Sequence, residues 1–393
     1  MTIKIAREGG RLPRTTPGAH ASTAPATPRS GRQFRSLLSH LAIALTATLL
    51  LGGCASENLH KAEAPRFQLA WPEPPDPARY VYEGQLRSPA DIRPENEDER
   101  LRRMLTGRGA VSTDPAYRKP AALAARKGRI YVADPPTASI VVFDIPRQRV
   151  FRMGVREPNQ VMKPVSLAID GAGRVYVLDS KRRTVMVYDA LGLFLFSVGD
   201  PKALNQPSGV AVSADGQRIF VVDRGSLEGD DHKVVAYAPD GKELFRLGPR
   251  GAGPGQFNIP LSATVSPDGT LFVLDSGNFR VQGFDLDGTP RLTFGNVGAG
   301  LGQFSRPRSI ATDPNGNIFV SDGSFNNVQI FNPRGQLLMW IGKPDLRNGP
   351  GQFGLIAAVA TDETGRLYVA DHYHNKIEVY RPVIAAEAQV PAR

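Results

Sequence analysis

The chain has 393 residues, and its 48 Lys and Arg against 38 Asp and Glu give a formal net charge of +10 at pH 7. Residues 1–53 contribute +6 of this charge, so the rest of the chain carries only +4 and lacks the basic excess of a nucleic-acid binder. Cys54 is the only cysteine, which excludes an internal disulfide.

Residues 1–53 have the pattern of a secretory signal peptide. A basic stretch precedes an apolar run from Leu37 to Leu51, which is too short and too rich in Ser and Thr for a confident spanning helix. An uncleaved anchor and an organellar transit peptide are the alternatives. The run ends in LGGC at 51–54, which resembles the bacterial lipobox, where small residues precede a cysteine that is diacylated. The resemblance implies export and a lipid anchor at Cys54 in the cell envelope, and Ala55 after that cysteine favours the outer membrane.

Residues 54–78 are expected to form a tether between this anchor and the folded domain. The Pro-rich stretch 70–77 (AWPEPPDP) should be extended and semi-rigid rather than packed. Residues 79–86 then read as a strand without a partner beside it in the sequence. A helix is expected near 95–106, because acids occupy its first turn and bases follow. We expect this helix to pack on the rim between the closing strand and the first repeat.

The rest of the folded part is repetitive. One pattern is written twice in succession between Gly251 and Gly342, with a period of roughly 40–50 residues that is typical of repeat architectures. Short apolar runs separated by Gly-centred turns predict a small antiparallel sheet in each copy. The same spacing recurs around six Asp residues, which gives repeats at about 119–154, 155–199, 200–248, 249–295, 296–342 and 343–382. These Asp residues are Asp134, Asp179, Asp223, Asp275, Asp322 and Asp371.

The predicted fold is therefore an all-β, six-bladed β-propeller over residues 79–382. The last repeat lacks a fourth strand, and residues 79–86 can supply it, which would close the ring and remove its open edges. Residues 383–393 are expected to be a disordered tail.

The repeats also resemble a known family. The GPGQF segment at 253–257, Pro260 and the NFRVQGF segment at 278–284 are similar to the NHL-repeat consensus. Residues 79–382 as a whole resemble bacterial six-bladed NHL-type propellers, which are often exported and often lipoproteins. The resemblance implies the fold and leaves the activity open, because propellers host binding modules and enzymes alike.

No catalytic residue, metal or cofactor is predicted. The six Asp residues are interpreted as acceptors of local backbone N–H groups, with Arg280 pairing with such a carboxylate. His372 and His374 could share a zinc ion, as histidines do in the channel of NHL-type amidating lyases, although solvated loop histidines are the favoured interpretation. The acidic insertion at 226–232 is interpreted as an exposed loop rather than a calcium site.

The predicted working surface is the face that carries the long loops, which are the turns after the second and fourth strands of each blade. Its side chains are mainly basic. The predicted binding residues are Arg182, Arg183, Arg250, Arg280, Arg306, Arg308, His372 and His374.

These residues suggest an anionic partner, either an acidic protein surface or a polymer, and not a nucleic acid. The favoured function is a lipid-anchored scaffold of the cell envelope that binds a protein or ligand. The alternative is a metal-dependent propeller enzyme, a lyase or lactonase, with its site at the axial channel.

Overall fold

The computed structural model describes residues 69–107, 109 and 111–383. The predicted signal peptide, Cys54, most of the tether and the predicted tail beyond Val383 lie outside these residues. In the described ranges no helix is long and apolar enough to cross a membrane. The description below concerns the compact unit that begins at Phe67.

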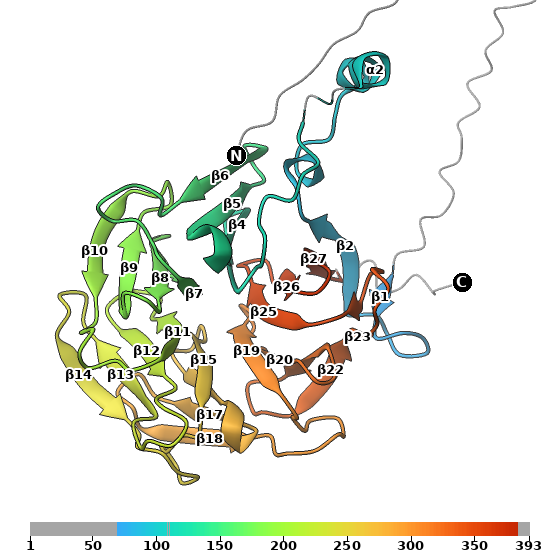
Figure 1. The fold of residues 1–393 in the computed structure, drawn as a ribbon. Helices are drawn as coiled ribbons and strands as arrows, with labels where there is room; N and C mark the ends of the chain where they lie inside the picture. The colour runs from blue at the N-terminus through green and yellow to red at the C-terminus, as the bar shows by residue number, and fades with distance from the viewer. Residues whose placement is uncertain (1–68, 108, 110, 384–393) are drawn as a thin grey trace, which may run out of the picture. The chain divides into compact units, whose positions relative to one another are not determined.

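The predicted propeller is confirmed: six antiparallel sheets follow one another around a central axis (Figure 1). Blade one holds β3 (Ala122–Arg126), β4 (Arg129–Asp134), β5 (Ser139–Asp144) and β6 (Arg149–Met153). Blade two holds β7 (Pro164–Ile169), β8 (Val175–Asp179), β9 (Thr184–Tyr188) and β10 (Phe194–Val198). Blade three holds β11 (Pro207–Val212), β12 (Ile219–Asp223), β13 (Lys233–Tyr237) and β14 (Glu243–Leu247).

The second half of the ring repeats this order. Blade four holds β15 (Pro260–Val265), β16 (Leu271–Asp275), β17 (Arg280–Phe284) and β18 (Pro290–Phe294). Blade five holds β19 (Pro307–Thr312), β20 (Ile318–Asp322), β21 (Asn327–Phe331) and β22 (Leu337–Ile341). Blade six holds β25 (Ile356–Thr361), β26 (Leu367–Asp371) and β27 (Lys376–Pro382), and a short parallel pair, β23 (Lys343–Pro344) and β24 (Gln352–Phe353), lies in the loop before it.

Burial along each blade follows from the stacking of the sheets. The second strands of blades two to six are buried at every position because each sheet is covered on both faces by its neighbours. The outer strands β10 and β14 instead alternate between partly buried and exposed residues. The first strands pack against one another around the axis, where small side chains such as Ala124, Ala211 and Ala311 limit crowding.

The ring closes through the N-terminal strand, as predicted. Strand β2 (Tyr80–Leu86) pairs antiparallel with β27, with Tyr82 opposite Tyr380 and a bulge before Gly84. The predicted fourth strand of blade six is therefore supplied by the chain segment that precedes blade one. This pairing covers the edge of β27 that would otherwise be open.

The expectation that residues 70–77 do not pack is wrong for Ala70 and Trp71. Strand β1 (Ala70–Trp71) pairs with β2 and adds a fifth strand to blade six. The Trp71 ring meets the Tyr380 ring edge-on at 5.3 Å between centroids. A Cβ at Gly351 would lie only 2.5 Å from the Trp71 ring, so this loop glycine leaves the space that the indole fills.

The predicted helix is present as α2 (Glu97–Thr106), but the expected packing of this helix is wrong. It begins with a capping box between Asn96 and Glu99 and has no buried residue. Leu101, Met104 and Leu105 are 55%, 77% and 76% exposed. The space between the closing strand and blade one is instead filled by Ile92 and Tyr117, whose hydroxyl donates to the Leu86 carbonyl at 2.5 Å.

Each blade is tied to the loop that leads into it by the Asp at the end of its second strand. This Asp accepts N–H groups from the residues just before the first strand of the same blade. All six carboxylates are buried. Asp322, for example, accepts from the backbone N–H groups of Ser305, Arg306 and Ser324 at 2.8, 2.9 and 2.8 Å. The structural interpretation of the six Asp residues is confirmed.

Replacing one of these carboxylates should destabilise the fold strongly. Asp322→Ala leaves several buried N–H groups without an acceptor, and we expect a loss of about 3 kcal/mol in the free energy of unfolding. Urea unfolding followed by circular dichroism measures this loss. Asp240→Ala removes an exposed Asp that caps one turn, and should cost much less. Equal losses of unfolding free energy in Asp322→Ala and Asp240→Ala would contradict the role of the buried carboxylate in joining the second strand to the entry loop.

Candidate functional site

The channel along the propeller axis opens on two faces of different construction. Strands in a blade run antiparallel, so turns after the first and third strands lie on one face and turns after the second and fourth lie on the other. We call these the short-turn face and the long-loop face. The prediction concerned the long-loop face.

At the long-loop face, three blades surround a cavity of about 450 Å³ beside the axis. Its cationic wall is formed by Lys119, Lys163, Lys181 and His372, and Met162 adds an apolar side chain. Lys119 and Lys163 each precede a proline at or just before the start of the first strand of their blade. The backbone N–H of Lys119 donates to Asp134, and that of Lys163 donates to Asp179. The Asp tie thus fixes the backbone from which these lysines project.

Two buried nitrogen atoms near this opening have no hydrogen-bond partner among the described residues: Nε of Arg308 and Nε2 of His372. Buried polar atoms usually have a partner, so each such atom requires an explanation. Arg306 and Arg308 flank the first residue of β19, and Arg306 is exposed. Arg308 Nε is available to a group that carries hydrogen-bond acceptors, and His372 Nε2 would donate to such a group when the imidazole carries a proton there.

The charges around these atoms repel one another. Burial lowers the pKa of His372, and the positive charges of Lys119 and Arg308 lower it further, against a smaller opposite effect of Asp371. Burial also lowers the pKa of Arg308, with a contribution from Arg306. The positive charges of Lys119, Arg306 and Arg308 are therefore crowded together here, and a bound anion would relieve their repulsion.

Three of the other predicted binding arginines donate hydrogen bonds within the protein. Arg280 donates to Asp275 at 2.8 Å and to three loop carbonyls, so its guanidinium is occupied within blade four, as its predicted pairing implies. Arg182 donates to the carbonyls of Gln160 and Pro158, and Arg250 to that of Leu227. Arg183 is exposed.

The favoured interpretation of the histidines as solvated is wrong. His374 is 6% exposed and its Nε2 lies 3.1 Å from the Asp345 carbonyl, while His372 contacts the axial opening, so the two imidazoles are used separately. His232 is fully buried: its Nδ1 accepts the N–H of Ile259 at 3.1 Å, so Nε2 donates to the Ser226 carbonyl. These rings fill loop interiors because long loops must satisfy their own backbone groups.

The acidic insertion of blade three is partly internal. Asp231 accepts from the Ser226 N–H at 3.0 Å and from the Asn205 amide at 2.7 Å, and these hydrogen bonds contribute to a lowered pKa, while burial opposes it. Glu228 and Asp230 are exposed. The insertion therefore presents two acids to solvent rather than three.

The residues at the long-loop opening do not suit a metal cation. Arg308, His372 and the lysines are cationic or repel cations, and every oxygen of the six nearby carboxylates already accepts at least one hydrogen bond. Across the described part of the chain, no group of three or more His, Cys, Asp or Glu side chains is arranged to hold a metal ion.

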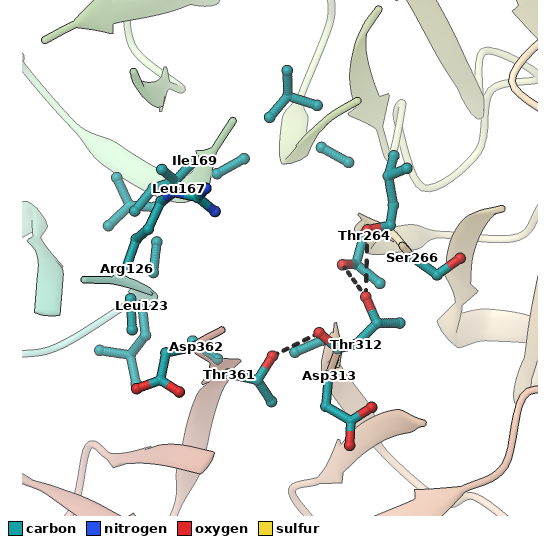
Figure 2. A pocket seen from close by; sticks show the side chains of 18 of the residues that line it. Leu123, Arg126, Leu167, Ile169, Thr264, Ser266, Thr312, Asp313, Thr361 and Asp362 are labelled. Atoms are coloured by element: carbon teal, nitrogen blue, oxygen red, sulfur yellow. Dashed lines mark hydrogen bonds between the residues drawn. The ribbon is translucent and has the colours of Figure 1, made fainter. Parts of the chain in front are cut away.

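The short-turn face holds a cavity of about 420 Å³ in the axial channel itself, which the sequence did not predict (Figure 2). Leu123, Leu167 and Ile169 line one side of it. Thr264 and Thr312 line the opposite side, and Thr361 lies between Thr312 and Leu123; all three carry hydroxyl groups. Strand alternation alone does not reveal this cavity, because it depends on how far six first strands stand from the axis.

Comparison with known proteins identifies the fold family. The family described as SMP-30/Gluconolactonase/LRE-like region matches residues 128–348, more than half of the chain. NHL repeat-containing protein 3 of Mus musculus is 32% identical over 111 residues, which cover 26% of this chain and 31% of the mouse protein. Peptidyl-glycine alpha-amidating monooxygenase A of Xenopus laevis is 31% identical over 160 residues, 37% of this chain and 16% of that protein. The chain thus spans less than a third of the length of these relatives.

Solved structures share the architecture at low identity. A Bacteroides thetaiotaomicron VPI-5482 protein of unknown function has a TM-score of 0.55 at 16% identity, over 70% of this chain and 72% of that one. The gluconolactonase XC5397 of Xanthomonas campestris has a TM-score of 0.52 at 20% identity, over 68% and 87% of the two chains. These similarities concern the fold alone.

The depressed pKa of His372 predicts a pH dependence of stability. An unfolded chain takes up the proton near pH 6.5, whereas the folded chain resists it, so this histidine removes stability as the pH falls below that value. We expect His372→Gln to lose less stability than the wild type between pH 7.5 and pH 5. Urea midpoints at both pH values measure the difference, and parallel losses would show that His372 is not the responsible group.

Proposed function

Since this chain belongs to the SMP-30/gluconolactonase/LRE-like family, we propose that its propeller is a lipid-anchored scaffold of the bacterial cell envelope that binds an anionic partner at its long-loop face. The partner is an acidic protein surface or an anionic polymer. It docks over the axial opening, where its negative groups meet the cationic wall of the cavity.

The observation that carries this proposal is the pair of buried, unpaired nitrogen atoms on Arg308 and His372. An anionic oxygen supplies an acceptor to a buried donor and a countercharge to crowded cations in a single contact. Lys119, Lys163 and Lys181 surround the same opening and offer further donors. A cleft with perturbed titratable groups is also a common property of functional sites.

The exposed cations lie over buried carboxylates, and this arrangement favours recognition at short range. At a distance, the buried Asp ring offsets much of the positive charge of the face. At contact, a partner meets the exposed lysines and arginines rather than these six carboxylates, because the carboxylate oxygens are already occupied by backbone N–H groups. We therefore expect the attraction to an anionic partner to be strongest at contact.

The anchor rests on the sequence. Cys54 follows a signal-peptide pattern and a lipobox-like LGG, and two or more acyl chains would hold the protein stably at a membrane. The alternative function, a metal-dependent lyase or lactonase, would need carboxylate or neutral imidazole ligands at the opening. His372 is one such imidazole, but Arg308 and the lysines around it repel a metal cation and favour an anion.

Charge reversal at the opening tests the binding proposal. The exposed side chains of Lys163, Lys181 and Arg306 make no hydrogen bond or ion pair within the described ranges, so changing them to Glu should leave the fold intact. We expect at least tenfold weaker binding to immobilised poly-L-glutamate or polyphosphate, because several charge-assisted contacts are lost. Calorimetry with each polymer distinguishes a protein-like partner from a phosphate-rich one.

A matched control changes the same net charge on the short-turn face. Lys127, Lys242 and Arg334 are exposed there, and their reversal to Glu should leave binding unchanged. If both triple variants bind either polymer equally, or if neither polymer binds the wild type, the docking proposal is wrong.

Substitution of the lipidation site tests the anchor separately. Cys54→Ser removes the only thiol, and we expect the protein to leave the membrane fraction or to accumulate unprocessed. Fractionation and mass spectrometry of the N-terminus measure both outcomes. A variant that fractionates with membranes exactly as the wild type does would rule out lipidation at Cys54.

A further inference from the structure

The axial cavity at the short-turn face has two chemically different walls. Leu123 from blade one and Leu167 and Ile169 from blade two form an apolar wall. Thr312 from blade five lies across the cavity from Leu167, and Thr361 from blade six lies between Thr312 and Leu123 (Figure 2). A volume of about 420 Å³ lies within the range of small-ligand pockets.

The hydroxyl groups of Thr361 and Thr312 donate their protons to acceptors within the protein. Thr361 Oγ1 donates to the Thr312 carbonyl at 2.6 Å. Thr312 Oγ1 lies 3.4 Å from the Val265 carbonyl and 3.3 Å from Thr264 Oγ1. A hydroxyl whose proton is committed still carries free lone pairs, so this wall offers acceptors to a ligand that brings donors.

Negative charge stands directly behind these acceptors. Asp313 and Asp362 follow Thr312 and Thr361 in the chain and are 2% and 8% exposed. Their oxygens accept local hydrogen bonds, as in the contact of Asp362 with the Tyr368 hydroxyl at 2.9 Å. A carboxylate has a stronger field where its surroundings exclude water. This wall therefore favours a cationic donor such as an ammonium group.

The apolar wall ends in a cation with an unused donor. Arg126 of blade one donates from Nη2 to the Gly171 carbonyl at 2.9 Å, but its buried Nε has no partner among the described residues. In Figure 2 its side chain lies beside Leu167 and Ile169, away from Asp313. The cavity thus has a positive donor beside its apolar wall, Asp313 and the Thr312 hydroxyl lie across from that donor, and Asp362 lies near Leu123 (Figure 2).

We propose that this cavity binds a small free amino acid with an aliphatic side chain. The carboxylate of the ligand pairs with Arg126, its ammonium group donates to the hydroxyls of Thr312 and Thr361, and its side chain packs against Leu123, Leu167 and Ile169. A peptide terminus carries only one of the two charges, so a free amino acid fits this arrangement better. The site lies on the face opposite the proposed docking surface and does not depend on it.

Calorimetry on the folded protein tests this proposal with L-leucine as the probe. We expect saturable binding in the micromolar to millimolar range. Leucinamide lacks the carboxylate and N-acetyl-leucine lacks the ammonium group, and each should bind at least tenfold more weakly, because one charge-assisted contact is lost. Glycine, which lacks the aliphatic side chain, should also bind more weakly.

Two substitutions assign the contacts to named residues. Arg126→Met keeps the aliphatic stem and should abolish the preference for leucine over leucinamide, whereas Arg334→Met, at an exposed residue that does not line the cavity, should keep it. Thr312→Val should abolish the preference for leucine over N-acetyl-leucine, and Thr312→Ser should retain it. Thermal melts check that each variant is folded.

Several results would overturn the proposal. Failure of the wild type to bind leucine at millimolar concentration would mean that only water occupies the cavity. Equal binding of leucine, leucinamide and N-acetyl-leucine would mean that the apolar wall alone retains them. Unchanged preferences in folded Arg126→Met would place the carboxylate elsewhere.

Discussion

The fold depends on one repeated constraint, the buried carboxylate at the end of the second strand of each blade. A charged group that is removed from water must be compensated, and here the compensation comes mainly from backbone N–H groups of the incoming loop. Asp322 cannot be satisfied unless Ser305 and Arg306 stand in one position. The carboxylate therefore fixes where each first strand starts, and six such starts define the axis of the ring.

The same constraint shapes the surface above it. A residue whose N–H points to a buried carboxylate directs its side chain toward the axial opening, as Lys119 and Lys163 do. On the long-loop face, the buried Asp carboxylates already accept hydrogen bonds at both oxygens. The exposed lysines above them have no such partners among the described residues. Arg308 and His372 lie between these carboxylates and lysines, and their unpaired nitrogen atoms follow from crowding rather than from a local defect.

Local spacing revealed most of the fold, because the signals of a propeller lie within single repeats. The six Asp residues, the pairing of Arg280 with Asp275 and the closing strand could all be predicted in this way. The packing of Trp71 against a loop at Gly351 could not, since the two are far apart in sequence and neither carries a local pattern. Helix α2 was located by the acids of its first turn and the bases that follow, but whether it packs depends on Ile92 and Tyr117, which fill the space between the closing strand and blade one.

Several residues of the candidate sites come from blades one and two, whose entry loops depart from the repeat pattern. Blades four to six carry the loops that end in Phe257, Phe304 and Phe353, which are fully buried and seal the junctions between blades. A Cβ at Gly342 would lie 2.5 Å from the Phe353 ring, so that junction has no room for variation. Blades one and two lack this loop, and they supply Lys163 and Lys181 on one face and Leu167 on the other. Arg308 of blade five and His372 of blade six join these lysines at the long-loop opening, so regular and irregular repeats together supply the candidate site.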